Sequence, residues 1–592
     1  MKLSKFNLLS IITAGTGIVA CNMQPETRQA HPNIVLFITD DQGYGDMSVH
    51  GNTNLSTPNI DGLAYNGVQF SHFFVQPVCS PTRAELLTGR YHPRSGVGGT
   101  ERGTERVHAD ETMIADIFRE AGYATAAYGK WHNGMQPPYH PNSRGFDEFY
   151  GFCAGHWADY FSPPLEHNGQ IVMGDGYIPD DITNRAIDFI KENHDSPFFI
   201  YLAFNTPHTP LQVPDKWYDK FKDKQLEMTT DDRYTENFDF TRAVLAMCEN
   251  IDWNVGRVMD VLKDLGVEDN TIVLFMGDNG PNSARWNDGM KGRKAHVDEG
   301  GVRSPLFIQW NDGIEQGAMI EEIAGVIDLL PTLTDLAGIE SETKHPIDGL
   351  SLKPLIMGEE QLWEERFIFS HFNDRVSVRS QRYRLDREGR LFDMVSDPGQ
   401  YTDISKNEPD VHKELSGAVE EWRRTVLSLL GPEDRPFTVG YPEALYTQLP
   451  AADGHPHGNA VRSNRWVSDS YFTNWTSVDD KITWDVEVLA SGNFDVEIYY
   501  TCPPADTGAS FTLSFGDSVL EGRITEPHDP PVIGMQNDRV PRQESYTKDF
   551  IPLNMGTIYL EQGRGEMKLQ AIDIPGSQVM DFKTLVLKRK DQ

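Results

Sequence analysis

The chain has 592 residues, of which 39% are hydrophobic and 24% are charged, so it is long enough for two or three folded domains and is not a disordered protein. Its 53 basic and 88 acidic side chains give a formal net charge of −35. This charge argues against a nucleic-acid partner and against adsorption to an anionic membrane surface. A site for an anion must therefore be a local positive pocket in an acidic body.

The N-terminus has the form of a targeting segment. A basic start is followed by an apolar run that is too short to span a bilayer comfortably. The run ends in Val19-Ala20-Cys21, which resembles the cleavage box of bacterial lipoproteins. This resemblance implies that residues 1–20 are a signal peptide and that Cys21 is lipidated. The protein would then be exported and membrane-anchored, in the periplasm or at the cell surface, through a tether over 21–31. A plain signal peptide is the alternative.

The first strand is expected at residues 33–38, a continuous apolar run of the kind that is buried on both faces of a parallel sheet. Asp40 and Asp41 follow it directly. Ligands of open α/β sheets gather at the carboxyl ends of the strands, and two adjacent carboxylates repel each other unless a cation joins them. We therefore expect a metal site here, with a surface turn as the alternative.

A cysteine at the start of a short helix is the next feature. Ser80 can serve as the N-cap of this helix, Pro81 suits its first turn, and Gly89 can end it. The side chain of Cys79 would then face the partial positive charge of the helix N-terminus, and Arg83 adds a fixed charge one turn later. This arrangement suits a nucleophile for an anionic substrate, although most free cysteines are buried and unreactive.

The strand-end pattern recurs three times further along the chain. Strands expected at 122–128, 197–204 and 271–276 are followed by Lys130 and His132, by His208, and by Asp278 and Asn279. Helical patterns lie between the strands, at 112–121, 182–193 and 237–265. This alternation predicts an α/β fold with a mostly parallel sheet flanked by helices, so the four strand ends would meet at one edge. Taken singly, each of these residues could also be a solvated lysine, a core histidine or a turn residue.

A glycine-rich loop with several cations, among them Lys294, is expected over residues 288–305. It leads into a further apolar strand at 305–310. Such a loop beside the sheet edge suits a sulfate or phosphate group, and a solvated basic loop is the alternative.

The character of the sequence changes twice after residue 360, which we expect to end a catalytic α/β domain over 32–360. Over 361–433, short strands expected at 367–370, 383–385 and 391–394 precede a helix with one apolar face, which predicts a small antiparallel α+β subdomain. Over 437–592, apolar and polar residues alternate in runs separated by turn residues, which predicts a β-sandwich. The sandwich could bind sugar or serve only as a structural module.

Three cysteines remain, at positions 153, 248 and 502. Their spacing fits neither a zinc site nor a redox motif, and an odd number argues against a disulfide framework. We expect them to be buried thiols.

Taken together, the motifs resemble the type I, formylglycine-dependent sulfatases of the alkaline phosphatase-like superfamily. The resemblance covers about residues 33–430. It rests on Cys79-Ser-Pro-Thr-Arg83 with Leu87-Thr-Gly89, Asp40-Asp41, Gly129-Lys-Trp-His132, Pro207-His208, Gly277-Asp-Asn-Gly280, and Lys294 with Glu299-Gly-Gly-Val-Arg303.

The resemblance implies a sulfuric ester hydrolase. Cys79 would be oxidised to formylglycine by a maturation enzyme, and the hydrated aldehyde would be the nucleophile. One Ca²⁺ would be bound by Asp40, Asp41, Asp278 and Asn279. Arg83 would activate the formylglycine, Lys130 and Lys294 would bind the sulfate oxygens, His208 would protonate the leaving alcohol, and His132 would accept the proton of the second hydroxyl.

The substrate is expected to be a sulfated polysaccharide or its oligosaccharides, such as ulvan or carrageenan from algae, or a glycosaminoglycan. His156, Trp157, Asp159 and Arg285 are the candidate substrate-binding residues. Two alternatives stay open, namely a phosphomonoester or phosphodiester hydrolase of the same superfamily and a non-catalytic glycan-binding lipoprotein. The first would usually show a Thr or Ser nucleophile and ligands for two metals. The oligomeric state is left open.

Overall fold

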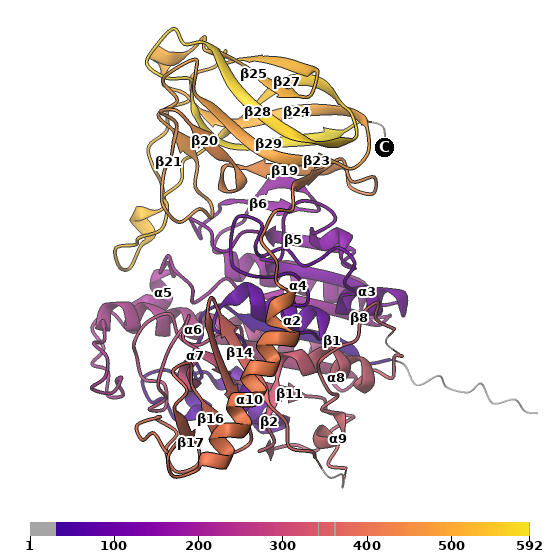
Figure 1. Ribbon diagram of the computed structural model, residues 1–592, viewed down its shortest axis with the longest axis vertical. Helices are drawn as coiled ribbons and strands as arrows, with labels where there is room; N and C mark the ends of the chain where they lie inside the picture. The colour runs from indigo at the N-terminus through magenta and orange to yellow at the C-terminus, as the bar shows by residue number, and fades with distance from the viewer. Residues whose placement is uncertain (1–30, 341, 360–362, 591–592) are drawn as a thin grey trace, which may run out of the picture.

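The computed structural model describes residues 31–340, 342–359 and 363–590. The expected signal peptide, Cys21 and nearly all of the expected tether lie outside these residues. Within the described ranges, the structure contains no helix with the length and apolar character needed to cross a membrane. Figure 1 shows an α/β region below and a β-sandwich above it, with helix α10 running along the front.

A ten-stranded sheet forms the centre of the α/β region. In spatial order its strands are β12 (Ala318–Ile320), β2 (Val68–Phe70), β11 (Leu306–Gln309), β9 (Thr271–Gly277), β1 (Asn33–Thr39), β8 (Phe198–Ala203), β4 (Ala124–Lys130), β5 (Glu148–Phe152), β6 (Pro164–His167) and β7 (Gln170–Met173). The five central strands, from β9 to β5, run parallel. The mostly parallel sheet predicted from the sequence is therefore confirmed.

Every residue of β1 is buried, because helices cover both faces of this sheet. Ile34, Leu36 and Ile38 pack with helices α2, α3 and α8, whereas Val35 and Phe37 pack on the other side with α1, α4 and α6. The helices of the region are α1 (Pro58–Asn66), α2 (Cys79–Thr88), α3 (Ile114–Glu120), α4 (Ile178–Asn193), α5 (Asp215–Tyr218), α6 (Phe238–Asp264), α7 (Glu299–Val302), α8 (Leu329–Leu336) and α9 (Lys353–Ile356). The three helices predicted between the strands are thus confirmed as α3, α4 and α6.

Two small sheets complete this part of the molecule. One joins β10 (Arg303–Ser304), β3 (Phe73–Phe74) and β13 (Ala324–Gly325), and β13 runs parallel to β3. The other is made by β14 (Ile368–Phe372), β15 (Arg375–Arg379), β16 (Tyr383–Leu385) and β17 (Leu391–Asp393). Helix α10 (Pro409–Thr425) packs against β15 and β16. The sequence predicted this combination of strands and helix but missed β15.

The C-terminal strands form two six-stranded sheets that enclose one apolar core. The first contains β18 (Phe437–Val439), β23 (Lys481–Val488), β28 (Gly563–Asp573), β25 (Ser510–Phe515) and β26 (Ser518–Arg523), with β20 (His455–His457) beside β23. The second contains β21 (Val461–Arg462), β22 (Phe472–Thr473), β29 (Asp581–Arg589), β24 (Gly492–Thr501) and β27 (Ile551–Leu560), with β19 (Tyr446–Pro450) beside β29. We call this unit, residues 437–589, the sandwich.

The sandwich lies against the β6 end of the central sheet (Figure 1). Gln448 in β19 donates from Nε2 to the Glu166 carboxylate in β6 at 3.1 Å. Thr438 donates from Oγ1 to the carbonyl of Pro137 at 2.7 Å. The sandwich is therefore hydrogen-bonded directly to the loops beyond the central strands.

Candidate active site

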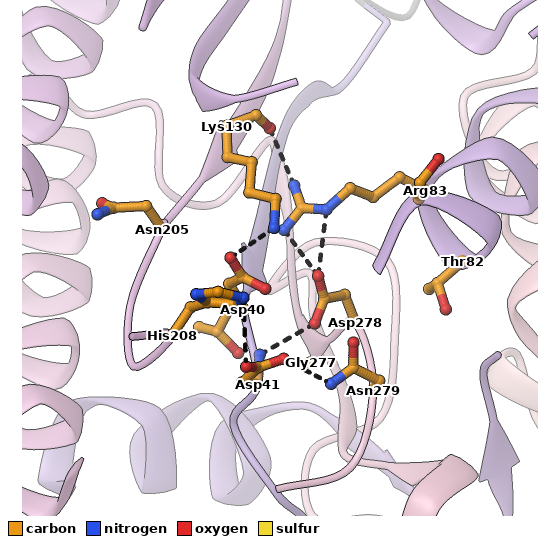
Figure 2. A network of polar contacts seen from close by, with 12 residues as sticks. Asp40, Asp41, Thr82, Arg83, Lys130, Asn205, His208, Gly277, Asp278 and Asn279 are labelled. Carbon is orange, nitrogen blue, oxygen red and sulfur yellow. Dashed lines mark hydrogen bonds and ion pairs between the residues drawn. The ribbon is translucent and has the colours of Figure 1, made fainter. Parts of the chain in front are cut away.

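The polar residues that follow the parallel strands lie at one edge of the sheet. Strands β9, β1, β8 and β4 are neighbours, so their carboxyl ends open on the same side. They deliver Asp278 and Asn279, Asp40 and Asp41, His208, and Lys130 with His132. Figure 2 shows most of these side chains pointing toward one another. The strand pattern predicted this convergence, and the structure confirms it.

Helix α2 brings Cys79 to the same place. The helix begins at Cys79 itself, and Val78 is its N-cap with no side-chain hydrogen bond. Our prediction of Ser80 as the N-cap was therefore wrong, because the Ser80 hydroxyl donates to the carbonyl of Glu105 at 3.4 Å. Gly89 ends the helix in a left-handed conformation, as predicted, with φ 67°. Cys79 is only 3% exposed, and its Sγ forms a group with Asp40 and Asp278 whose ligand atoms all lie within 4.8 Å.

Each of the three carboxylates at this edge is paired with a cation. Lys130 Nζ lies 2.7 Å from Asp40 Oδ2, and Lys294 Nζ lies 2.7 Å from Asp41 Oδ1. Arg83 Nη2 donates to Asp278 Oδ2 at 2.9 Å. Arg83 also donates to the carbonyl of Lys130 at 2.9 Å, so one guanidinium ties α2 to two strand ends. Charge-assisted bonds of this kind fix the geometry of a buried site.

The carboxylates differ in how their surroundings shift their pKa values. Burial raises the pKa of Asp40, and burial together with the charge of Asp40 raises the pKa of Asp278 to about 6. Burial acts in the same direction on Asp41, but the ammonium of Lys294 and the imidazole of His208 outweigh it and lower the pKa of Asp41. The cluster thus concentrates negative charge on Asp41.

The donor atoms at this edge fit a metal ion that prefers oxygen ligands. Asp40 Oδ1 and Asn279 Oδ1 are buried, and neither finds a hydrogen-bond partner among the residues that the structure describes. The carboxylates of Asp41 and Asp278 lie beside them, since Asn279 Nδ2 donates to Asp41 at 2.9 Å and Asp278 accepts from the Asp41 N–H at 3.1 Å. The structure therefore contains an acidic cluster that could hold a metal ion.

His132 presents one unpaired nitrogen. Its Nε2 lies 2.7 Å from the carbonyl of Thr100, so it carries the proton, whereas the buried Nδ1 has no partner among the described residues. Burial and the charge of Lys130 lower the pKa of His132 well below its usual range. A Cβ on Gly155 would lie 2.8 Å from Nε2, so only glycine leaves room for this ring. The neutral ring can accept a proton at Nδ1.

His208 has the opposite tautomer. Its Nδ1 donates to the carbonyl of Thr209 at 2.6 Å, and its Nε2 lies 3.7 Å from Asp41 Oδ2. His156 stacks on it with a centroid distance of 5.9 Å. Burial and the charge of Lys294 lower the pKa of His208 to about 4. An arriving anion would raise that pKa again by countering the lysine charge.

Of the four candidate substrate-binding residues, only His156 lies with the histidines of the site. Trp157 stacks on Phe152 at 5.1 Å and lines, with Asp159, a cavity of about 150 Å³ between the α/β region and the sandwich. Arg285 is fully engaged elsewhere, since it donates to Asp46 at 2.6 Å and to the carbonyl of Asp41 at 3.1 Å. Its hydrogen bonds support the Asp41 loop, and its predicted contact with the substrate stays a prediction.

Several supporting residues were missed by the sequence reasoning. Tyr201 accepts from Arg83 at 3.3 Å from within β8, and Ser304 bonds both the N–H and the carbonyl of Gly277, just before Asp278. Two sandwich residues lie near the histidines: Ser468 lines the same crevice as His132, and Glu544 accepts a hydrogen bond from Thr209, the neighbour of His208. Ser304 belongs to the loop that we singled out, but no local pattern marks the sandwich residues, because they are distant in sequence.

Family comparisons agree with this geometry. A family model described as "Sulfatase" matches residues 32–339, and a model described as "N-sulphoglucosamine sulphohydrolase, C-terminal" matches residues 291–425. The chain is similar to the N-acetylgalactosamine-6-sulfatase of Mus musculus, with 29% identity over 413 residues that cover 64% of this chain and 75% of the relative.

Solved structures show the same likeness. The structure of Ps i-CgsB in complex with k-i-k-neocarrahexaose is 31% identical, with a TM-score of 0.60, and the match covers 66% of this chain and 92% of that one. A phosphonate monoester hydrolase of Agrobacterium radiobacter, at 21% identity and a TM-score of 0.53 over 66% of this chain and 95% of that one, shares the fold alone. Because the sulfatase model spans more than half of the 592 residues, the chain belongs to the sulfatase family and is a sulfuric ester hydrolase.

Proposed function

We propose that this protein hydrolyses sulfate esters of a sulfated polysaccharide or of its oligosaccharides, using a formylglycine made from Cys79 and one calcium ion. The observation that carries the proposal is the position of Cys79. It begins α2, its sulfur is grouped with the carboxylates of Asp40 and Asp278, and Arg83 lies one turn later. A buried nucleophile beside fixed cations is what an anionic ester requires.

The chain's own cations would bind the sulfate group. Lys130 holds its ammonium group against Asp40, which borders Cys79, and Lys294 holds its ammonium group against the adjacent Asp41, so both could contact oxygens on sulfur. Their charge would stabilise the additional negative charge that develops as sulfur is attacked. Arg83 would orient the nucleophile from inside the helix. In its hydrated form, the formylglycine would supply the attacking oxygen.

Asp40, Asp41, Asp278 and Asn279 would hold the calcium ion. All four offer hard oxygen atoms, whereas zinc prefers nitrogen and sulfur ligands. When bound, the ion would supply positive charge against a sulfate oxygen. The buried, unpaired Oδ1 atoms of Asp40 and Asn279 support this assignment.

The two histidines would move protons. His208 would protonate the leaving alcohol from Nε2, which faces Asp41, while Nδ1 stays bonded to Thr209. His132 would accept a proton at Nδ1, its unpaired nitrogen. Acid and base on separate residues allow both halves of the reaction to proceed at one pH.

The relatives narrow the substrate class without naming the substrate. One is an N-acetylgalactosamine-6-sulfatase, and another was solved with k-i-k-neocarrahexaose. We propose a sulfated glycan of one of these kinds, an algal polysaccharide such as carrageenan or ulvan, or a glycosaminoglycan. We also propose a maturation enzyme as a partner, a lipid anchor at Cys21, and domain limits at 32–360, 361–433 and 437–592.

Mass spectrometry of the mature protein tests the chemistry. We expect the peptide that contains residue 79 to be about 18 Da lighter than its unmodified form when the protein is made with a maturation enzyme. The protein should then release sulfate from one member of a panel that includes N-acetylgalactosamine 6-sulfate and k-i-k-neocarrahexaose.

The control for this experiment is Cys79→Ala, which should fold normally and release no sulfate. Activity that persists in Cys79→Ala would contradict the proposed nucleophile. Faster hydrolysis of 4-nitrophenyl phosphate than of any sulfate ester would favour the phosphoesterase alternative.

A further inference from the structure

We infer that the sandwich is a working part of the active site, and that Glu544 in it is a positioning residue for His208. This inference rests on the proposed function, because it assigns His208 the proton for the leaving alcohol. Neither matched family model extends beyond residue 425, so the contribution of the sandwich lies outside both matched regions.

The contact between the two parts runs through Thr209. The Thr209 hydroxyl donates to Glu544 Oε1, across 335 positions of the sequence. The carbonyl of the same residue accepts from His208 Nδ1 at 2.6 Å and from the Tyr160 hydroxyl at 3.1 Å. Thr209 is therefore held by the sandwich through its side chain, and it holds the imidazole through its backbone.

The carboxylate of Glu544 is itself fixed. Its Oε2 accepts the N–H of Gln543 at 3.1 Å, so both of its oxygens are engaged. Arg542 forms an ion pair with Asp538 in which the side chains are 1% and 6% exposed. Arg542 also donates to the carbonyl of Ser545 at 3.2 Å, which closes the segment around Glu544. A buried bidentate pair of this kind holds a loop in one conformation.

The same segment is bonded to the α/β region on both sides of Thr209. Gln212 donates to the carbonyl of Gly534 at 2.7 Å and accepts from the N–H of Tyr160 at 2.7 Å. Arg542 also donates to the carbonyl of Ala158. In Figure 1 the segment is the gold loop that extends from the sandwich toward the α/β region. Residues 534–545 are thus hydrogen-bonded to the two segments that carry His156 and His208.

A second sandwich loop reaches the other histidine. The ideal Cβ position at Gly155 lies 2.8 Å from His132 Nε2 and 3.2 Å from Ser468 Oγ, and both side chains line one crevice. Asp469 accepts the N–H of Ala158 at 2.9 Å. The sandwich therefore borders both histidines that we assign to proton transfer.

The consequence for catalysis follows from the position of the proton. A general acid must hold its proton within hydrogen-bond reach of the leaving oxygen. Among the described residues, Glu544 accepts hydrogen bonds from Thr209 and from the Gln543 N–H, so we assign it the role of fixing Thr209 and hence the ring plane of His208. Loosening that ring should slow the hydrolysis of esters whose leaving group must be protonated. It should have little effect on esters whose leaving group departs as an anion.

The test uses the full-length, matured protein and two aryl sulfates. Thr209→Val and Glu544→Ala each remove one end of the contact, and Thr209→Ser and Glu544→Gln each restore it. Thr438→Val is the matched control, because it deletes another hydroxyl bond between the sandwich and the α/β region, at 2.7 Å to Pro137. Phenyl sulfate has a poor leaving group, and 4-nitrophenyl sulfate has a good one.

We expect Thr209→Val and Glu544→Ala to lower kcat for phenyl sulfate by about ten- to a hundredfold, but kcat for 4-nitrophenyl sulfate by less than about threefold. KM should change little, the restoring variants should recover most of the loss, and Thr438→Val should behave like the wild type on both esters. Thermal melting of each variant reports whether it is folded.

Equal losses on both esters, or no loss on either, would overturn the role of Glu544 while leaving the sulfatase function intact. A matured wild-type protein that cleaves neither these esters nor any sulfated sugar would overturn the proposed function, and the role of Glu544 with it.

Discussion

At the scale of single residues, the buried acidic and basic side chains of the active site are equal in number. Three buried carboxylates carry −3 and three cations carry +3, so the cluster is neutral by itself. A divalent ion bound to the carboxylates would leave a net charge of +2, which an anionic ester can offset. A bound divalent ion would therefore make the site attractive to an anionic ester in a protein whose overall charge is −35. The residues concerned are Asp40, Asp41, Asp278, Arg83, Lys130 and Lys294.

The two lysines should differ in what they contribute to stability. The Lys130 side chain is 0% exposed, and Lys130→Met would leave Asp40 buried without its cation, at a cost of about 3–5 kcal/mol. Lys294 is 22% exposed and its partner Asp41 keeps a bond from Asn279, so Lys294→Met should cost about 1–2 kcal/mol. Both variants should lose about a hundredfold or more in kcat.

Urea unfolding and turnover measurements check this prediction. Lys220→Met is a suitable control, because its ion pair with Glu249 involves a half-exposed lysine and is worth little. Equal losses of stability in the two active-site variants would contradict the difference in burial on which the prediction depends.

At the scale of elements, the site exists because four parallel strands end together. Antiparallel neighbours would send alternate strand ends to opposite edges, whereas β9, β1, β8 and β4 all open on one edge. Helix α2 adds its N-terminus to that edge, and the loop before α7 adds Lys294. Most of the catalytic candidates thus lie in a rigid element or shortly after one, which limits their motion.

Metal removal should abolish activity without unfolding the sheet. Dialysis against a calcium chelator should remove sulfate release, because the four oxygen ligands at these strand ends would lose their ion. The fold should persist, since Lys130, Lys294 and Arg83 already neutralise the carboxylates. Activity assays and far-UV circular dichroism before and after dialysis measure both effects.

Calcium added back should restore activity, and zinc should not, because the ligands are hard oxygen atoms. Asn279→Leu, which removes one of the proposed ligands, should require more calcium for the same recovery. Activity that survives chelation would show that no exchangeable metal takes part.

At the scale of the whole molecule, the sandwich and the α/β region enclose two acids in one crevice. Glu105 comes from the α/β region and Asp453 from the sandwich, and both line the crevice beside His132. Burial and the charge of Asp453 raise the pKa of Glu105 to about 7, and burial raises the pKa of Asp453 to about 6 although Gln136 bonds it. The contact between the two parts is therefore sensitive to pH.

The sign of this effect follows from linkage. The folded protein retains the Glu105 proton up to about pH 7, whereas the unfolded chain releases it near the ordinary pKa of 4.5, so stability falls as pH rises across this window. Glu105→Gln removes the free-energy cost of ionising this buried carboxyl group. We expect it to raise the free energy of unfolding at pH 8 by about 1–3 kcal/mol, with no gain at pH 4.

Denaturant unfolding at the two pH values measures this difference. Glu120→Gln, a substitution of an exposed glutamate on α3, controls for the loss of one negative charge. A gain in Glu105→Gln that is the same at both pH values would contradict the assignment of the raised pKa.

The sequence by itself determined the elements and the identity of the residues at their ends. Mostly continuous apolar runs predict the buried strands β1, β4, β8 and β9, because a strand buried on both faces favours apolar side chains along its length. The rule that ligands gather at strand ends then places the candidate acids, lysines and histidines together. Strand β15 was missed because its residues Arg-Val-Ser-Val-Arg mix charge with a short apolar period.

Only the tertiary structure decided which groups support those residues. The start of α2 at Cys79, the engagement of Arg285 with Asp46, and the bond from Thr209 to Glu544 all depend on how distant segments pack. No local pattern records such contacts, because a hydrogen bond across hundreds of residues leaves the periodicity of neither segment changed. The residues that carry the chemistry can therefore be predicted from the strand ends, whereas the link from His208 through Thr209 to the sandwich appears only in the tertiary structure.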